Sequence, residues 1–443
     1  MPGERGAPLP LMAASAVLMI LIGAADHLRA QEKGEYGPVP VRDSEKPLMK
    51  TVTETEELFL RRNARAPESN VASLVASIGA VLAPKPADDY VHYRFYVLRD
   101  PTANAFALPD GQVYVQAGLI ALLENEAQLA SVLAHEVNHT AGHHGILSYR
   151  SVRSKSVAGM VFGPLTLGLS DVFLGLSISG YSRELEEEAD ARGQTLMLEA
   201  GWDPREMPRT FELLQGDPDV ETPHHATAWS SHPQLPARAE AARARAATLL
   251  PEGPASDLKV NAAGYRDRVR PLSCAVVLGL IEDDYPRSAC VLARRLVAEA
   301  PGSPATRYVL AEALRGLGPL PEVAAPDEAT ESEKKHNVKE RARLTRAERE
   351  AALLATPAGV EQKKTNLAAA RSEYLKTLDL DSTIAEASRG LGLAEEGLGN
   401  YEAAGRALIA YLRARPEASD RPVILRQLDR ITVALKGSKE AHP

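Results

Sequence analysis

The chain has 443 residues, of which 44% are apolar, so it is long enough for two or three domains with sizeable cores. Its 51 basic and 59 acidic residues give a formal net charge of −8. The chain therefore lacks the strongly basic composition that is typical of nucleic-acid-binding proteins. We therefore expect a folded protein that has no nucleic-acid partner.

The first thirty residues have the pattern of an export signal. Arg5 precedes an apolar run from Leu11 to Ala25, and small residues suited to cleavage follow, with Ala25 and Ala30 as the two possible positions. Because this apolar run is short for a membrane-spanning helix, we expect a cleaved signal peptide over residues 1–30. An uncleaved membrane anchor is the alternative.

The next segment, residues 31–252, is expected to form one domain, with a helix over 71–82, where apolar residues recur at helical spacing. A strand is expected over 90–98, because aromatic and β-branched residues dominate there. Two shorter strands, over 104–108 and 113–115, are joined by a Pro-Asp-Gly turn. These patterns predict a small sheet ahead of the next helix.

That next helix contains His135, Glu136 and His139 in the order H-E-x-x-H, and Asn125 is the candidate cap at its start. Because residues four apart share one face of a helix, the two imidazoles can converge on a single cation. Glu136 is too close to the first histidine to be the natural third ligand, but its carboxylate can take the proton of an attacking water. The motif therefore predicts peptide-bond hydrolysis by zinc.

Two further histidines, His143 and His144, follow the motif after a glycine. They lie outside the pair spaced four residues apart, so we expect neither to bind the metal. The alternative interpretation of the whole motif is a surface helix with solvated histidines. A catalytic zinc needs three protein ligands and an open fourth position, so a third ligand elsewhere in the chain decides between the two interpretations.

An acidic helix with the sequence Y-S-R-E-L-E-E-E-A-D-A-R-G follows at residues 181–193. It contains S-R-x-x-E-x-E-A-D-x-x-G, the pattern that accompanies H-E-x-x-H in the M48 family of zinc metallopeptidases, so the chain resembles that family at two separated motifs. The resemblance implies that Glu186 is the third zinc ligand and that Asp190, one helical turn later, is a supporting carboxylate. Asp190 would accept the free N–H of a ligand imidazole and fix its tautomer. Arg183 and Glu187 are expected to be solvated.

The resemblance extends to the predicted sheet, because N-A-F-A-x-P followed by G-x-V-Y-V resembles the sheet ahead of the M48 active-site helix. It implies that a substrate peptide lies extended along an edge strand made of Asn104, Ala105, Phe106 and Ala107. Main-chain pairing of that kind selects unfolded segments rather than a particular sequence. An ordinary hairpin is the alternative.

A third match lies in S-S-H-P-Q-L-P-A-R, which resembles the last M48 signature and contains His232 and Arg238. In periplasmic members of the family, a histidine at this position can approach the zinc and either switch the enzyme off or assist the reaction. The resemblance implies such a role for His232 and a supporting role beside the metal for Arg238. The alternative for His232 is a structural cap of the helix that contains Arg238.

Between the two metal-binding motifs, residues 158–180 are almost uncharged, and Asp171 is their only ionisable residue. This segment also contains several glycine and serine residues and one proline. We expect a pair of apolar helices or a loop over the active-site cleft, in contact with a membrane surface. A re-entrant or spanning segment is the alternative.

The composition loosens near residue 253, so a linker is expected over 253–270. Residues 271–443 are expected to be helical, with pairs of short amphipathic helices that resemble tetratricopeptide repeats. Such repeats stack into a concave surface for extended peptides or partner proteins. A dense charge run over 327–364 interrupts them and is expected to be a solvated helix or loop.

The only two cysteines, Cys274 and Cys290, fall on two successive predicted helices. In an exported chain they could form a disulfide across that helical hairpin. Two separate buried thiols are the alternative.

Together these patterns predict an α+β fold: a mainly helical metallopeptidase domain of the zincin type with a small sheet, followed by an all-α repeat domain. The resemblance implies an exported endopeptidase with one Zn²⁺ per chain, similar to the periplasmic proteases of Gram-negative-type bacteria that police outer-membrane protein assembly. The expected substrates are unfolded or misassembled envelope proteins. The repeats would recruit substrate or outer-membrane assembly machinery.

Two other functions remain open from the sequence. The first is a chaperone or assembly factor in which the repeats carry the role and the protease site is mostly shut. The second is an integral-membrane M48 protease, which would require several spanning helices.

Overall fold

The computed structural model describes residues 41–42, 45, 70–86, 89–148, 150, 181–216, 234–250, 257–321 and 346–440. The expected signal peptide over 1–30, the apolar segment 158–180 and His232 lie outside the described residues.

A three-stranded sheet stands at the start of the described chain. Its strands are β1 (Arg94–Leu98), β2 (Ala105–Ala107) and β3 (Gln112–Gln116), arranged in the order β1-β3-β2. The predicted hairpin is present, because β2 and β3 pair antiparallel across the Pro-Asp-Gly turn. The earlier strand β1 pairs with β3 in parallel. The central strand is therefore β3, and within this sheet β1 and β2 are its edges.

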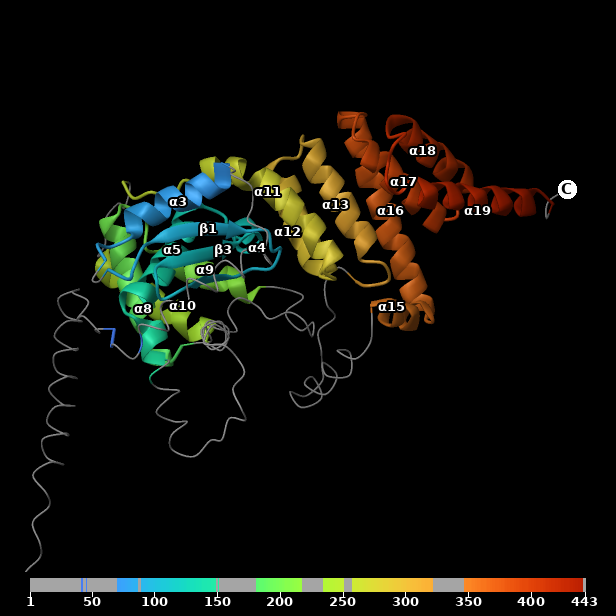
Figure 1. Cartoon of the computed structure of the whole chain (residues 1–443). Helices are drawn as coiled ribbons and strands as arrows, with labels where there is room; N and C mark the ends of the chain where they lie inside the picture. Colours follow the sequence, from blue (N-terminus) through green and yellow to red (C-terminus); the bar gives the residue numbers. More distant parts are fainter. Residues whose placement is uncertain are drawn as a thin grey trace, which may run out of the picture.

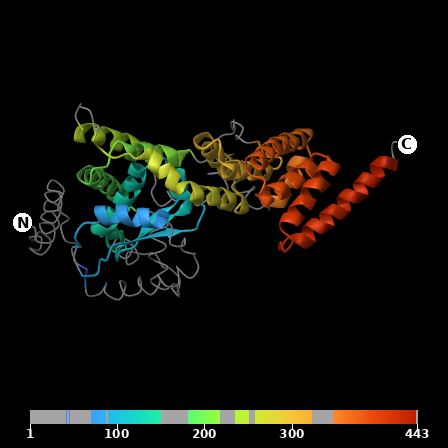
Figure 2. The ribbon, with the colours of Figure 1, turned by 90° about the horizontal axis from the view of Figure 1, so that it is seen from above.

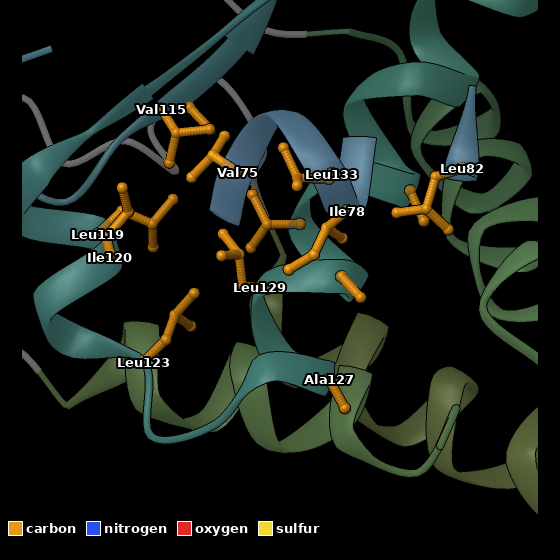
Figure 3. Close-up of a cluster of buried hydrophobic side chains, with 14 of the residues drawn as sticks. Val75, Ile78, Leu82, Val115, Leu119, Ile120, Leu123, Ala127, Leu129 and Leu133 are labelled. Atoms are coloured by element: carbon orange, nitrogen blue, oxygen red, sulfur yellow. The ribbon is translucent and has the colours of Figure 1, made fainter. Parts of the chain in front are cut away.

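The first core lies between one face of this sheet and two helices, α3 (Asn70–Leu82) and α5 (Glu126–Ala141). Helix α3 has the apolar face that its helical spacing predicts, and it packs against β1 and α5 (Figure 1). Figure 3 shows this core, with side chains that come from α3, β3, α4 (Ala117–Leu122) and α5: Val75, Ile78, Val115, Leu119, Leu129 and Leu133. On the opposite face of the sheet, Tyr114 stacks between Tyr96 and Phe106.

Helix α5, which contains the H-E-x-x-H motif, is buried from Ala127 to Ala141. As predicted, Asn125 caps its first turn, with the side-chain oxygen accepting a hydrogen bond from the Gln128 backbone N–H at 2.9 Å. The side-chain amides of Asn125 and Gln128 both donate to Glu206, at 2.8 and 3.0 Å. The start of the helix is therefore fixed to a neighbouring element by hydrogen bonds as well as by apolar packing.

Three helices surround α5 on the side away from the sheet: α8 (Arg183–Glu199), α9 (Glu206–Gln215) and α10 (Leu235–Leu249). Helices α8 and α9 both pack against α5, and α10 packs against α8 and α9. At Gly193, α8 comes close to α5, and a Cβ added there would lie 3.5 Å from the His135 backbone nitrogen. The two predicted metal-binding helices are therefore closely packed at this point.

The residues described after α10 are mainly helical, and each of these helices packs on its neighbour to form an array (Figures 1 and 2). Its members are α11 (Ala262–Glu282), α12 (Pro286–Glu299), α13 (Pro304–Gly316), α15 (Arg346–Leu354), α16 (Pro357–Leu380), α17 (Ala385–Gly397), α18 (Tyr401–Ala414) and α19 (Arg421–Glu440). The expected combination of a mainly helical domain with a small sheet and a following all-α region is confirmed. Among the described helices, none has both the length and the apolar character needed to cross a membrane.

The expected linker over 253–270 is wrong from residue 262 onward, because α11 begins there and packs on the first core. Tyr265 and Val269 belong to that core, and the Tyr265 hydroxyl donates to the Ile120 carbonyl at 2.7 Å. Ile120 lies on α4 (Ala117–Leu122), the short helix between β3 and α5. On the next helix, Arg295 donates to the carbonyls of Ala121 and Leu122 at the end of α4. The helical array is therefore packed directly against the element that leads into α5.

Two smaller predictions can also be compared with the structure. No disulfide joins Cys274 on α11, which is half-buried, to Cys290 on α12, which is buried. Within the charge run over 327–364, the described part is helical: it comprises α15 and the start of α16. The long helices α16 and α19 lie within residues 271–443, the region that was expected to be helical.

We predict that Tyr265→Ala destabilises the protein by about 3–5 kcal/mol, because it removes a fully buried aromatic side chain from the first core. Arg268→Ala, on the exposed face of the same helix, should change the free energy of unfolding by only about 0.5 kcal/mol. Denaturant unfolding of both variants measures the difference. Equal small effects would show that α11 is a linker after all.

Candidate metal centre

Helices α5 and α8 bring three potential metal ligands together: His135, His139 and Glu186. All three side chains are buried, and one ligand atom from each lies within 4.8 Å of the others. The Nε2 atoms of His135 and His139 are 2.9 Å apart. One Glu186 oxygen lies 3.6 Å from His135 Nε2, and the other lies 3.5 Å from His139 Nε2. The four-residue spacing on α5 and the crossing of α8 therefore produce one convergent cluster.

This donor set fits a catalytic zinc ion. Two imidazole nitrogens and one carboxylate oxygen are a known ligand combination for zinc, and they leave a fourth position open. Ligand atoms about 2.0–2.1 Å from a tetrahedral zinc lie roughly 3.3 Å from one another. The separations of 2.9, 3.5 and 3.6 Å bracket that value. Small side-chain adjustments would thus be enough to accommodate the ion.

Asp190, one turn after Glu186 on α8, contacts the other nitrogen of a ligand histidine. Its Oδ1 lies 2.9 Å from His135 Nδ1, so it accepts a hydrogen bond when that nitrogen is protonated. This leaves Nε2 of His135 with its lone pair toward the cluster, as metal binding requires. Burial raises the pKa of Asp190, but the charge and hydrogen bonds of Arg238, and then His135, outweigh it and lower the pKa to about 2.

Arg238 on α10 holds the two buried carboxylates side by side. Its guanidinium donates to both oxygens of Asp190, at 2.7 and 2.8 Å, and lies 2.8 Å from Glu186 Oε2. The guanidinium also stacks on the ring of Phe211 of α9, 4.6 Å from its centroid. Only 5% of Arg238 is exposed to solvent. One cation is therefore shared between two acids that would otherwise repel each other.

Glu136 is also buried, at 1% exposure, on the same turn of α5 as His135. Burial is the larger cause of the raised pKa of Tyr181, and the negative charge of Glu136 raises this pKa further. Tyr181 lies just before α8, and its ring stacks on that of His139 at 4.0 Å between centroids. The carboxylate thus lies in the same buried region as the three potential ligands.

Sequence reasoning missed the environment of the second ligand histidine. His144 is not among the three potential ligands, but its Nδ1 lies 2.9 Å from Nδ1 of His139. Its Nε2 lies 3.8 Å from Glu188 on α8, and Glu188 pairs with Arg192 at 3.0 Å. Burial, followed by the charge of His135, lowers the pKa of His144 to about 3, so this imidazole is neutral at ordinary pH. The H-x₄-H spacing from His139 to His144 is the signal in the sequence that could have predicted this contact.

The remaining predicted site residues lie at the edge of the sheet and on the exposed face of α8. Ala105, Phe106 and Ala107 form β2, which is an edge of the sheet and packs against α5, and Asn104 directly precedes this strand. The Thr140 hydroxyl of α5 donates to the Leu108 carbonyl at 3.2 Å, just after the strand. The expected solvated pair, Arg183 and Glu187, is exposed on α8, with 2.7 Å between the two side chains.

We predict that Arg238→Gln destabilises the metal-free protein by about 3–5 kcal/mol, because it leaves two buried carboxylates without their shared cation. The matched control is Arg243→Gln on the same helix. Arg243 pairs with Glu212, but both side chains are more than half exposed, so the change should cost at most about 1 kcal/mol. Chemical denaturation in the presence of a chelator compares them. Losses of similar size would contradict the role given to Arg238.

Comparisons with known proteins agree with this geometry. Residues 67–246 match peptidase family M48. A similar protein is the mitochondrial metalloendopeptidase OMA1 of Schizosaccharomyces pombe, 36% identical over 28% of this chain and 37% of that relative. Others are the putative beta-barrel assembly-enhancing protease of Vibrio cholerae, 31% identical over 32% of each chain, and the beta-barrel assembly-enhancing protease of Yersinia pestis, 29% identical over 41% of this chain and 39% of that relative.

The chain thus spans between about a third and two fifths of the length of these relatives. The matched family segment covers α3, the sheet, α5, α8 and α9 and most of α10, and it contains all three potential metal ligands. Residues 67–246 therefore form a metallopeptidase domain of family M48.

Proposed function

We propose that this protein is a zinc-dependent endopeptidase that uses His135, His139 and Glu186 as metal ligands. The observation that carries the proposal is the convergence of these three side chains from two helices in a buried cluster, with Glu136 next to His135. A solvated surface helix, the alternative interpretation of the motif, does not account for a cluster in which each of the three residues is at most 2% exposed.

The protein's own side chains supply the acid–base chemistry. A zinc ion held by the three ligands would act as a Lewis acid toward the scissile carbonyl. The Glu136 carboxylate takes a proton from the attacking water and later delivers it to the leaving amine. Asp190 and Arg238 keep His135 and Glu186 oriented for this reaction, because each contacts one of the ligands directly.

The proposed substrate is an unfolded segment of protein that pairs with β2. This strand is an edge of the sheet, so it can accept another extended chain through main-chain hydrogen bonds. It also packs against α5, the helix that contains Glu136, which supports a position beside the cluster for a paired peptide. Pairing through the main chain depends little on sequence, which suits an enzyme that removes many misfolded proteins.

We further propose that the protein acts in the periplasm on misassembled outer-membrane proteins. The similarity to beta-barrel assembly-enhancing proteases of two bacteria supports this role. The stacked helices α11 to α19 would act as tetratricopeptide-like repeats that bind substrate or assembly machinery, since arrays of this kind offer an extended surface. His232 would block the open metal position or assist the reaction.

The first test is Glu136→Gln, which removes the general base and keeps the size of the side chain. We expect casein degradation to fall by about 10²–10⁴-fold while zinc content remains that of the wild type. Purified wild-type and variant protein are compared for activity and for bound metal. A variant that degrades casein at the wild-type rate contradicts the mechanism. A cellular role that survives in this variant would favour a chaperone or assembly factor.

The second test concerns the ligands themselves. His139→Ala and Glu186→Ala are each expected to lose tightly bound zinc and activity together, because two protein ligands hold the ion far less strongly than three. The matched control is Glu187→Ala, adjacent to Glu186 but exposed on α8, which should keep both. Metal analysis after dialysis distinguishes the variants. Retention of one zinc per chain by Glu186→Ala would remove that residue from the ligand set.

A further inference from the structure

The turn after α5 folds the chain back onto the metal-binding helix. The helix ends at Ala141, Gly142 follows as its C-cap, and His143 adopts a left-handed backbone conformation with φ of 52°. This turn places His144 against His139, with the two Nδ1 atoms 2.9 Å apart. Gly142 makes room for the ring: a Cβ added there would lie 2.4 Å from His144 Nε2. The turn and Gly142 together position the imidazole of His144.

The contact between the two imidazoles fixes where their hydrogens lie. A hydrogen bond between two ring nitrogens requires one donor and one acceptor. When His139 offers the lone pair of Nε2 to a metal, its hydrogen is on Nδ1, so His139 donates and His144 accepts. His144 then carries its own hydrogen on Nε2, the atom 3.8 Å from Glu188. The metal-binding tautomer of His139 thus determines which nitrogen of each imidazole carries the hydrogen.

The two ligand histidines are therefore supported in the same manner by different residues. His135 donates to Asp190, a carboxylate that Arg238 neutralises. His139 donates to His144, whose Nε2 faces Glu188, the carboxylate that pairs with Arg192. Each chain of contacts runs from a ligand imidazole to a carboxylate and then to an arginine. The second chain has one more imidazole, His144, between the ligand histidine and the carboxylate.

We propose that His144 is a positioning residue that holds His139 in its metal-binding tautomer and orientation, with Glu188 as its partner. This inference rests on the proposed zinc site and adds residues that the H-E-x-x-H motif and the acidic helix do not include. His144 lies on the side of the His139 ring away from the ligand cluster, so it acts through His139 rather than on the metal. If His144 only filled space in the core, its ring would not need to present a hydrogen-bond acceptor to His139.

The test compares His144→Leu, which removes the acceptor, with His144→Asn, whose side-chain oxygen occupies nearly the position of Nδ1. We expect the zinc dissociation constant to rise about 10–100-fold in His144→Leu and to stay within about threefold of wild type in His144→Asn. Competition with a chromophoric chelator measures these constants on the full-length protein. The visible spectrum of the Co²⁺-substituted protein should shift in His144→Leu and return toward that of the wild type in His144→Asn.

A second pair of variants keeps the test independent of packing at position 144. Glu188→Gln should weaken zinc binding, while Glu187→Gln, next to it and exposed on α8, should not. Thermal unfolding of the metal-free proteins records any general loss of stability. If wild type takes up no zinc, the proposed function itself fails. If wild type binds one zinc but His144→Leu binds it equally tightly, or if His144→Asn is impaired as much as His144→Leu, only this inference is overturned.

Discussion

The constraint on which the structure depends is the burial of two carboxylates, one helical turn apart, beside two imidazoles. Glu186 and Asp190 share a face of α8, and without compensation their charges would repel each other and disfavour burial. Arg238 resolves this by contacting both, at 2.7 to 2.8 Å. The cluster is therefore complete only when α5, α8 and α10 are all in place. The chain between α8 and α10 in sequence supplies α9, whose Phe211 lies under the guanidinium. The metal centre therefore forms only where these helices have packed together.

The surrounding fold holds α5 at both of its ends. Its start is fixed by Asn125 and by hydrogen bonds to Glu206 of α9, and its end is fixed by the turn that seats His144. The helical array adds a third constraint, because Tyr265 and Arg295 bind carbonyls of α4, the element just before α5. The array is therefore packed through α4 onto the domain that contains the metal centre. A ligand or substrate bound on the array would contact the same continuously packed structure. This contact supports the proposal that the array recruits substrate for cleavage in the same chain.

The parts of the site that follow from local rules could be predicted from the sequence, whereas those that depend on long-range packing could not. The four-residue spacing of His135 and His139 makes them converge wherever a helix forms, and the Asn125 cap and the β2–β3 hairpin are equally local. Glu186 came only from a family resemblance, because no local rule brings α8 to α5. His144 was set aside because it lies outside the pair spaced four residues apart, and its actual position depends on a left-handed residue at His143. Residues 262–270 resembled a linker because the burial of Tyr265 is created by α4, far away in the sequence.

The central claim is that two imidazoles from α5 and one carboxylate from α8 bind a single zinc ion, and X-ray absorption spectroscopy tests it most directly. The protein would be measured at the zinc edge in a His232→Ala background, so that this histidine cannot add an imidazole. We predict only nitrogen and oxygen ligands about 2.0–2.1 Å from the metal, with outer-shell scattering that fits two imidazoles. Failure of this protein to retain zinc, a coordination shell that includes sulfur, or outer-shell scattering that does not fit two imidazoles would contradict the account.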